Sequence, residues 1–180
     1  LGWLHPSTTG MGAPSEEAMI LDSPGWAPGE GMLDLDAHGV PALFRRIQGS
    51  WRGRYYKLSP DASRQSAFDG LFTISIAGNR YLQTNHYQFD DGSTMELTFS
   101  GTFANGYLSM ESESRQNFRA RAWQAGADLI LFESLKVEAG VRIRYLEMIL
   151  FDSPATRART TLEYRDGAFA GVNFIREEKL

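Results

Sequence analysis

The chain has 180 residues, of which 42% are hydrophobic and 22% charged, and its formal net charge is −4 at pH 7. This length favours one domain with a sizeable core, and the acidic balance argues against a nucleic-acid partner and an anionic membrane surface. The absence of cysteine excludes disulfides and thiolate chemistry and fits a reducing compartment, so we expect a cytoplasmic protein. No apolar run reaches the roughly 18–20 residues of a membrane-spanning helix.

Residues 1–39 differ from the rest of the chain in composition. They contain four prolines and many glycines, which argue against regular structure except for a short helix over residues 15–21. The same segment carries apolar side chains such as Trp3 and Trp26, which a solvated tail does not need. We expect an irregular arm that packs on the domain or covers a cavity as a lid. A flexible leader or a tag remnant is the alternative. The chain begins with Leu1 and not with Met, so a lost signal peptide is also an open alternative.

Residues 40–47 precede the first strand. Leu43, Phe44 and Ile47 recur with the spacing of a helix face, which predicts one or two helical turns. In a closed barrel, a short helix at this position plugs one end. Residues 40–180 are therefore predicted to form one domain, a barrel with a short helix before its first strand.

Turn signals recur at regular intervals after Trp51. Pairs such as Gly78-Asn79, Asn105-Gly106 and Asp166-Gly167 supply the positive φ angles that two-residue hairpins require. Nine such signals separate about ten segments of strand character, and no helix-length amphipathic segment interrupts them. Short loops force neighbouring strands to pair antiparallel, and closure removes the two exposed edges. The predicted fold is all-β, an up-and-down antiparallel β-barrel of about ten strands.

The first and last strands carry residues that would meet if the sheet closes. We expect Trp51, at the start of the first strand, to lie opposite Arg176, near the end of the last, in a cation–π contact. The same register turns Tyr55 and Phe174 toward the interior of the barrel.

A Gly-x-Trp at the head of the first strand, with an Arg near the end of the last, resembles the lipocalin and wider calycin signature. Four stretches in order, over residues 44–55, 80–85, 145–149 and 157–160, are similar to a family of uncharacterised lipocalin-like proteins common in cyanobacteria and other bacteria. The resemblance covers about residues 43–180. It implies a calycin-like barrel with a ligand cavity and no known reaction. Ten strands depart from the eight of true lipocalins and are nearer to fatty-acid-binding or nitrobindin-like barrels.

The Gly78-Asn79 turn sets a hairpin register that places aromatic, aliphatic and amide side chains on one face. It pairs Ile74 with Gln83 and Phe72 with Asn85. Such a face is typical of a cavity wall with a few convergent polar groups, and a core with satisfied amides is the alternative. The predicted ligand-binding residues of this wall are Phe72, Ile74, Gln83 and Tyr87, together with Tyr55 and Phe174, and Tyr81 and Asn85 are candidate donors to a ligand carbonyl or developing enolate.

A two-residue turn at Asp166-Gly167 points Arg157, Arg159 and Glu163 into the barrel. Buried charges need partners. One account is internal pairing, with Glu163 meeting Arg144. The other is an anionic group of a ligand held by Arg157 and Arg159. A turn one residue longer would place all three side chains on the surface.

Glu147 lies in a run that is apolar on both faces. A carboxylate in apolar surroundings is a candidate general acid or base, and a structural glutamate paired with an arginine is the alternative. The register that turns Arg144 inward turns Glu147 outward, so both cannot face the interior.

The three histidines, His5, His38 and His86, are widely separated, and no nucleotide-binding or hydrolase motif occurs. We therefore expect neither a metal nor a cofactor. The expected function is binding of a small, largely apolar organic molecule, with a cofactor-free cyclisation or isomerisation by Glu147, Tyr81 and Asn85 as the catalytic hypothesis. A non-catalytic carrier or sensor and a protein-interaction barrel that forms a homodimer are the alternatives.

Overall fold

The computed structural model of the chain describes residues 33–115 and 117–180. The predicted lid and the short helix over residues 15–21 lie outside the described residues. The described part of residues 1–39 is short. In it Asp36 accepts hydrogen bonds from the backbone of His38 and Val40 and pairs with Arg45, which ties this segment to the helix that follows.

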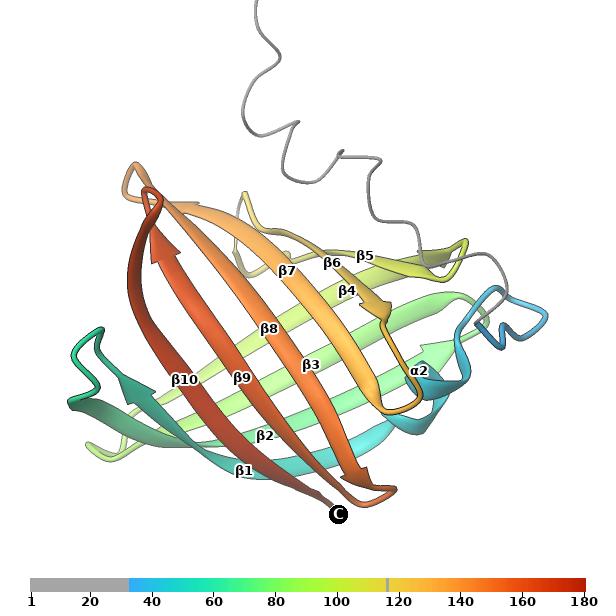
Figure 1. Ribbon diagram of the computed structural model, residues 1–180, viewed down its shortest axis with the longest axis horizontal. Coiled ribbons are helices and arrows are strands. Elements are labelled where there is room, and N and C mark those ends of the chain that lie inside the picture. Colours follow the sequence, from blue (N-terminus) through green and yellow to red (C-terminus); the bar gives the residue numbers. More distant parts are fainter. Residues whose placement is uncertain (1–32, 116) are drawn as a thin grey trace, which may run out of the picture.

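The described residues form one short helix and ten antiparallel strands that close into a barrel (Figure 1). Each strand pairs with its neighbours in sequence, and β1 pairs with β10. This confirms the predicted fold class. The elements are α2 (Ala42–Arg46), β1 (Gly49–Leu58), β2 (Arg64–Ala77), β3 (Arg80–Phe89), β4 (Thr94–Ala104), β5 (Tyr107–Glu111), β6 (Arg119–Gln124), β7 (Leu129–Glu138), β8 (Val141–Ser153), β9 (Thr156–Arg165) and β10 (Ala168–Lys179).

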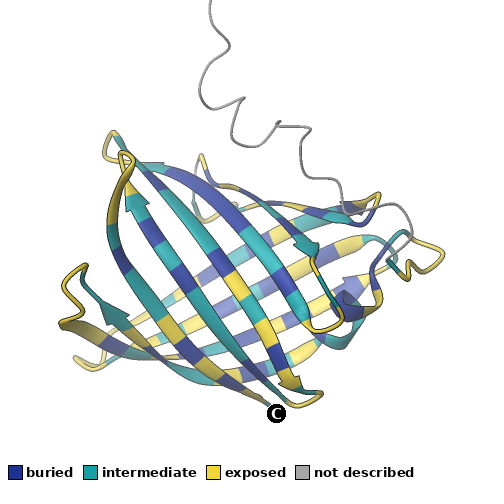
Figure 2. Cartoon of the chain, in the orientation of Figure 1, coloured by how far each residue is buried: buried dark blue, intermediate teal, exposed yellow. Residues whose placement is uncertain are grey.

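Burial alternates along the strands, because successive side chains point to opposite faces of a sheet (Figure 2). In β3, for example, Tyr81, Gln83 and Asn85 are buried, whereas Leu82 and His86 are exposed. One set of side chains therefore fills the barrel and the other set forms its outer surface.

The α2 helix plugs one end of the barrel, as the spacing of its apolar residues predicts. Phe44 packs edge-on against Phe103 with ring centroids 5.0 Å apart. The Trp51 indole Nε1 donates to the carbonyl oxygen of Ile47 at 2.8 Å, which joins the helix to β1. Within the described residues, no helix is long and apolar enough to cross a membrane.

Hairpin registers set by short turns agree with the sequence. Asp166 and Gly167 both have positive φ angles, 47° and 84°, and Ala168 pairs with Arg165 across the turn. The Gly78-Asn79 turn likewise pairs Phe72 with Asn85. The loop between β8 and β9 is short as well, because Ser153 already pairs with Thr156.

A β-bulge in β10 shifts the pairing with β9 by one residue between Phe169 and Gly171. Gly171 has a φ of 145°, and a Cβ there would lie 2.4 Å from the backbone oxygen of Leu58. The bulge reverses the faces of the residues that follow, since a shift of one residue exchanges inside and outside. Phe174 consequently points outward and is 42% exposed.

The predicted contact between Trp51 and Arg176 is wrong. Trp51 pairs with Lys179, three residues further along β10, and Arg176 pairs with Arg54. The Arg176 side chain is 69% exposed and forms an ion pair with Asp152 on the outer surface. The barrel nevertheless closes, because β1 and β10 are joined along eight residue pairs from Trp51 to Leu58.

Candidate functional site: the barrel cavity

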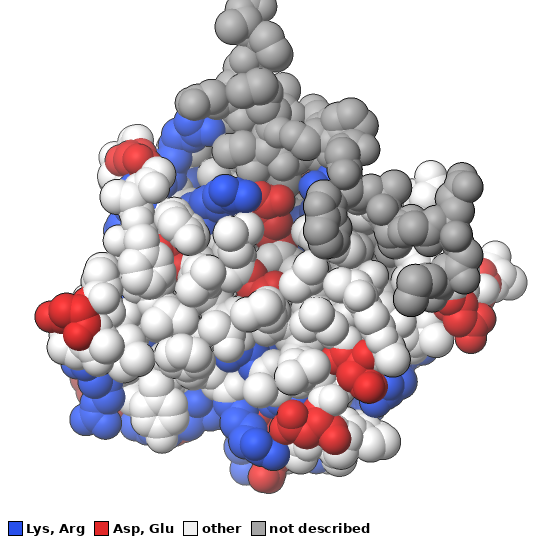
Figure 3. Space-filling view, in the orientation of Figure 1, with Lys and Arg blue, Asp and Glu red and all other residues white. Residues whose placement is uncertain are grey.

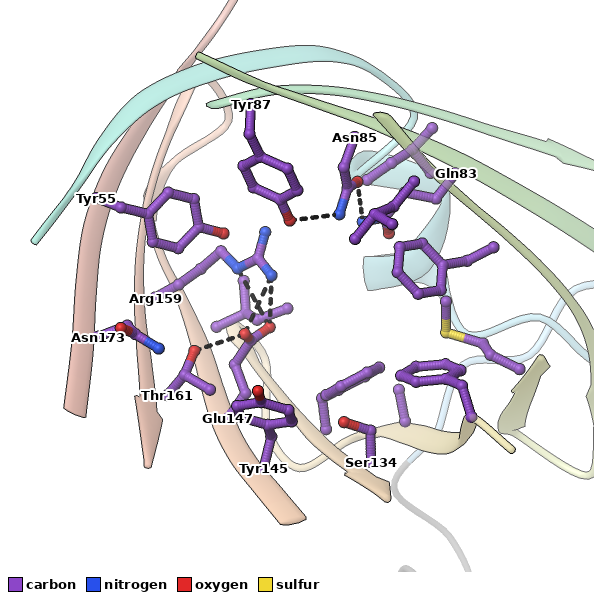
Figure 4. A pocket seen from close by; sticks show the side chains of 18 of the residues that line it. Tyr55, Gln83, Asn85, Tyr87, Ser134, Tyr145, Glu147, Arg159, Thr161 and Asn173 are labelled. Carbon is purple, nitrogen blue, oxygen red and sulfur yellow. Dashed lines mark hydrogen bonds and ion pairs between the residues drawn. The ribbon is translucent and has the colours of Figure 1, made fainter. Parts of the chain in front are cut away.

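A cavity of about 300 Å³ lies inside the barrel between the α2 plug and the opposite end. Its size is at the lower end of the usual range for small-molecule sites. Most of its wall is aromatic or aliphatic, with contributions from Ile74, Leu97, Phe99, Phe132 and Ile149. Two groups of polar side chains face each other across it, one on strand β3 and one on strands β8 to β10, and further polar side chains come from β1 and β7 (Figure 4).

A row of hydrogen-bonded side chains runs along the inner face of β3. The Tyr81 hydroxyl donates to Gln83 Oε1, and Gln83 Nε2 donates to Asn85 Oδ1 at 2.6 Å. Asn85 Nδ2 then donates to the Tyr87 hydroxyl oxygen at 2.9 Å (Figure 4). These residues are two apart, so they stand side by side on the same face of the strand. Each of the two amides thereby accepts one hydrogen bond and donates one within the row.

An ion-pair cluster faces this row from β8, β9 and β10. Arg159 binds Glu147 through two nitrogens, with Nη2 2.8 Å and Nε 3.1 Å from Oε1, and its Nη1 lies 3.1 Å from Glu177 Oε1. Thr161 donates to Glu147 Oε2 at 2.7 Å, and Arg157 Nε donates to Glu177. The cluster thus contains two arginines and two carboxylates, all largely buried.

The two arginines have different surroundings. The guanidinium carbon of Arg157 lies 4.2 Å from the centroid of the Trp51 ring, and burial lowers the pKa of Arg157. Arg159 lies over Phe72 at 5.1 Å. Burial acts to lower the pKa of Arg159, but the charge of Glu147 together with those of Glu177 and the nearby tyrosines outweighs it and holds that pKa well above its usual value. Arg159 is therefore a fixed cation within this site.

Tyr55 contributes an inward hydroxyl from β1. Its ring stacks on Phe68 at 4.7 Å and meets Tyr87 at 6.0 Å between centroids. Figure 4 shows its hydroxyl beside Arg159. Burial raises the pKa of both Tyr55 and Tyr87, so both hydroxyls keep their protons.

Charged side chains also line the end of the cavity away from α2. Glu163 pairs with Lys57 at 3.0 Å and with Arg165 at 2.7 Å. Lys136 pairs with Glu138 at 2.7 Å. Arg115 lies near Met95, and its Nε is buried without a hydrogen-bond partner among the described residues.

Most of the sequence-predicted site residues come together in this cavity. Its lining includes Tyr55, Ile74, Tyr81, Gln83, Asn85, Tyr87, Glu147, Arg157 and Arg159. Phe72 does not line it and packs in the core against Tyr55 and beneath Arg159. Phe174 lies outside, because of the β10 bulge, and Arg176 lies on the outer surface.

The question of parity in β8 is resolved by the register with β9. Glu147 pairs with Thr161 and faces inward, whereas Arg144 bonds Glu133 and does not line the cavity. The predicted pairing of Glu163 with Arg144 is therefore wrong. The surroundings of Glu147 also differ from the expected apolar setting, since its carboxylate is bound by Arg159 and Thr161.

Sequence reasoning missed one member of the cluster, Glu177, and gave no role to Thr161. Glu177 is fully buried, although the run Arg-Glu-Glu-Lys near the end of the chain is typical of a solvated strand end. The signal that points to it is its alternation with Ile175, which is also buried. No group of three or more His, Asp or Glu side chains in residues 33–115 and 117–180 is placed to hold a metal ion.

Comparisons with known proteins identify the fold. No protein-family model matches the chain, and no curated protein matches it. Among solved structures, a protein of unknown function from the DUF3598 family of Nostoc punctiforme is 18% identical with a TM-score of 0.60. The match covers 76% of this chain and 48% of that one, so the chain spans about half the length of that relative.

Two further structures match over most of their own length. The S-type phycobiliprotein lyase CpeS from Guillardia theta is 12% identical with a TM-score of 0.56, over 76% of this chain and 90% of that one. Rv2717c from Mycobacterium tuberculosis is 13% identical with a TM-score of 0.59, over 82% and 99%. Identities this low establish that the fold is shared, and they carry no statement about activity. By fold, this chain is a closed antiparallel β-barrel similar to these three proteins.

Proposed function

We propose that the protein binds a small, largely apolar organic molecule inside the barrel. The observation that carries the proposal is a cavity of about 300 Å³ whose wall is mostly aromatic and aliphatic and into which a few polar side chains converge. A barrel of this size can instead be filled completely by side chains. The similarity in fold to a phycobiliprotein lyase is in keeping with the proposal.

Binding is favoured over cofactor-free cyclisation or isomerisation. Among the groups expected to act as acid, base or donor, Glu147 is held by Arg159 and Thr161, and Tyr81 donates its proton to Gln83. Asn85 is bonded on both sides within its strand. A catalytic role would require these bonds to break. A carrier or sensor requires only that the cavity open to a ligand.

The test is saturable binding of an apolar probe, 2-ethylnaphthalene, followed by its fluorescence, with native mass spectrometry of the purified protein to detect a bound molecule. Ser134 lines the cavity, so Ser134→Phe should reduce the affinity for the probe by at least ten-fold as it fills the space. Ser109 is exposed on the outer face, and Ser109→Phe is the matched control. Equal binding by both variants, or no saturable binding by the unmodified protein, would overturn the proposal.

A second candidate function, self-association, is favoured by the outer face of the barrel. Tyr56, Phe174 and Met148 lie in one row across β1, β10, β9 and β8, joined through Thr160. Each of the three is between 42% and 48% exposed. The space-filling view over β8 to β10 shows a broad uncharged area with charged groups gathered toward its margins (Figure 3). Like apolar faces of two copies can pack about a two-fold axis.

Light scattering over a range of concentrations tests this candidate. A dimer that Met148→Lys converts to a monomer supports it, with Glu96→Lys on the far strand β4 as the control. A protein that stays monomeric up to high micromolar concentration contradicts it. The result is independent of whether the cavity binds a probe.

A further inference from the structure

We propose that the ligand of this cavity is uncharged, and that its polar end is a hydrogen-bond acceptor, such as a carbonyl oxygen, received by the hydroxyls of Tyr55 and Tyr87. The inference rests on the proposed binding function and specifies the chemistry of the ligand. It differs from the expectation that Arg157 and Arg159 hold an anionic group.

The charge balance of the cluster argues against an anion at this place. Arg157 and Arg159 carry two positive charges, and Glu147 and Glu177 carry two negative charges within the same contacts. Arg159 directs Nε and Nη2 to Glu147 and Nη1 to Glu177. A ligand carboxylate would have to displace one of these carboxylates or lie beside two of them, and like charges in a buried site repel strongly.

The direction of the hydrogen bonds along β3 leaves Tyr87 with a donor to offer. Each member of the row donates to the next, from Tyr81 through Gln83 and Asn85 to the Tyr87 oxygen. The Tyr87 hydroxyl is thus an acceptor from Asn85, and its own proton is not used in the row. Its proton is available to an acceptor in the cavity.

Tyr55 offers a second donor. Its hydroxyl forms no hydrogen bond with any residue in the described ranges, yet it lines the cavity. Stacking on Phe68 and edge contact with Phe72 hold the ring in place. The Tyr55 and Tyr87 rings are 6.0 Å apart, and Figure 4 shows both hydroxyls directed to the same part of the cavity, next to Arg159.

A molecule that is apolar over most of its surface and carries one acceptor fits this cavity. The wall suits its apolar part, the two hydroxyls suit its acceptor, and the ion-pair cluster is already neutralised. Burial raises the pKa of both tyrosines, which keeps them as donors across the ordinary pH range. Lys57 and Lys136, at the other end of the cavity, are each paired with a carboxylate. Arg115 is the cation there whose Nε lacks a partner, so the test includes an anionic probe.

Three naphthalenes of similar size provide the test at pH 8, with affinities measured by fluorescence titration. They are 2-acetylnaphthalene, which carries a neutral acceptor, 2-naphthoate, which carries a negative charge, and 2-ethylnaphthalene, which carries no polar group. We expect the ketone to bind tightest. Tyr55→Phe and Tyr87→Phe should each weaken ketone binding about five-fold, the equivalent of one ordinary hydrogen bond, and leave 2-ethylnaphthalene unchanged.

Glu147→Gln supplies the converse test. It removes one negative charge from the cluster and leaves Arg159 incompletely balanced, so binding of 2-naphthoate should strengthen about ten-fold or more relative to the ketone. A thermal melt of each variant confirms that it is folded.

The outcomes separate this inference from the proposed function. If none of the three probes binds the unmodified protein, the binding function itself fails. If the probes bind but 2-naphthoate binds tightest, or if the two Tyr→Phe variants weaken the ketone and 2-ethylnaphthalene equally, the cavity binds ligands and the assignment of a neutral acceptor is overturned.

Discussion

The guanidinium carbon of Arg157 lies 4.2 Å from the centroid of the Trp51 ring at the end of the barrel that α2 plugs. Arg157 also donates to Glu177, which pairs across β1 and β10 with Gly53, two residues after Trp51. The contact joins the first strand to the last two. It combines a cation on an aromatic face with a buried ion pair, so its loss should lower the free energy of unfolding.

Replacing Arg157 by methionine should lower the free energy of unfolding by about 3 kcal/mol, because it leaves Glu177 buried with fewer partners. Urea denaturation measures the effect. Arg176→Met is the matched control on the outer surface and should change stability by no more than about 1 kcal/mol. Equal effects of the two substitutions would show that Arg157 does not stabilise the closed end.

Gly171→Ala should destabilise the barrel by roughly 1–3 kcal/mol, since a φ of 145° strains any residue with a Cβ and the new atom would meet the Leu58 carbonyl oxygen. Gly126→Ala has no atom within 4 Å of the added Cβ and serves as the control. Thermal denaturation of the two variants compares them. A neutral Gly171→Ala would mean that the bulge relaxes without cost.

Asn85→Leu tests the hydrogen-bonded row on β3. The substitution leaves Gln83 Nε2 without an acceptor and removes the donor to Tyr87, so we expect a loss of about 2 kcal/mol. His86→Ala, the next residue, removes a side chain that lies on the outer face and pairs with Glu96. It should cost less than about 1 kcal/mol in the same chemical denaturation. If Asn85→Leu proves as mild as His86→Ala, water replaces the missing partners.

Acid should remove the contribution of Glu163 to stability. Burial acts to raise the pKa of Glu163, but hydrogen bonds from Lys57 and Arg165 outweigh it and hold that pKa below its usual value of 4.5. A carboxyl with a lowered folded-state pKa stabilises the protein above the unfolded-state pKa, and the contribution disappears as pH falls through the folded-state value.

The measurement is the difference in unfolding free energy between the unmodified protein and Glu163→Gln. It should be largest from about pH 5 to 7 and shrink as pH falls below 4.5. A difference that stays constant from pH 7 to pH 3 would contradict this assignment of the pKa.

Local signals in the sequence were sufficient for the architecture and for one wall of the cavity. The Gly78-Asn79 turn defines the register of β2 and β3 over a few residues, so the inward row of Gln83, Asn85 and Tyr87 follows from the turn alone. The Asp166-Gly167 turn is equally local. Arg157 and Arg159 do line the cavity, but the prediction also placed Phe174 inside. It succeeded for the arginines because the three-residue error between β1 and β10 and the one-residue bulge in β10 cancel at β9.

The sequence did not predict the registers that depend on strands far apart in the chain. No turn joins β1 to β10, and the bulge at Gly171 carries no signal that distinguishes it from an ordinary glycine in a strand. The error of three residues in the pairing of Trp51 therefore put Arg176 in the place of Lys179. Two cations lie over the indole, Arg157 at 4.2 Å and Lys179 at 5.4 Å from the ring centroid. A shift of one residue likewise turned Phe174 outward.

By itself, then, the sequence determined a closed barrel of about ten strands, its plug, and the residue types that face its interior, because turn chemistry and alternation act over neighbouring residues. Only the tertiary structure decided which charges meet. Glu147, Arg159 and Glu177 come from three strands, and their pairing depends on closure and on single-residue shifts that no local pattern records. That pairing is the reason why we propose a neutral acceptor, rather than an anionic group, as the polar end of the ligand.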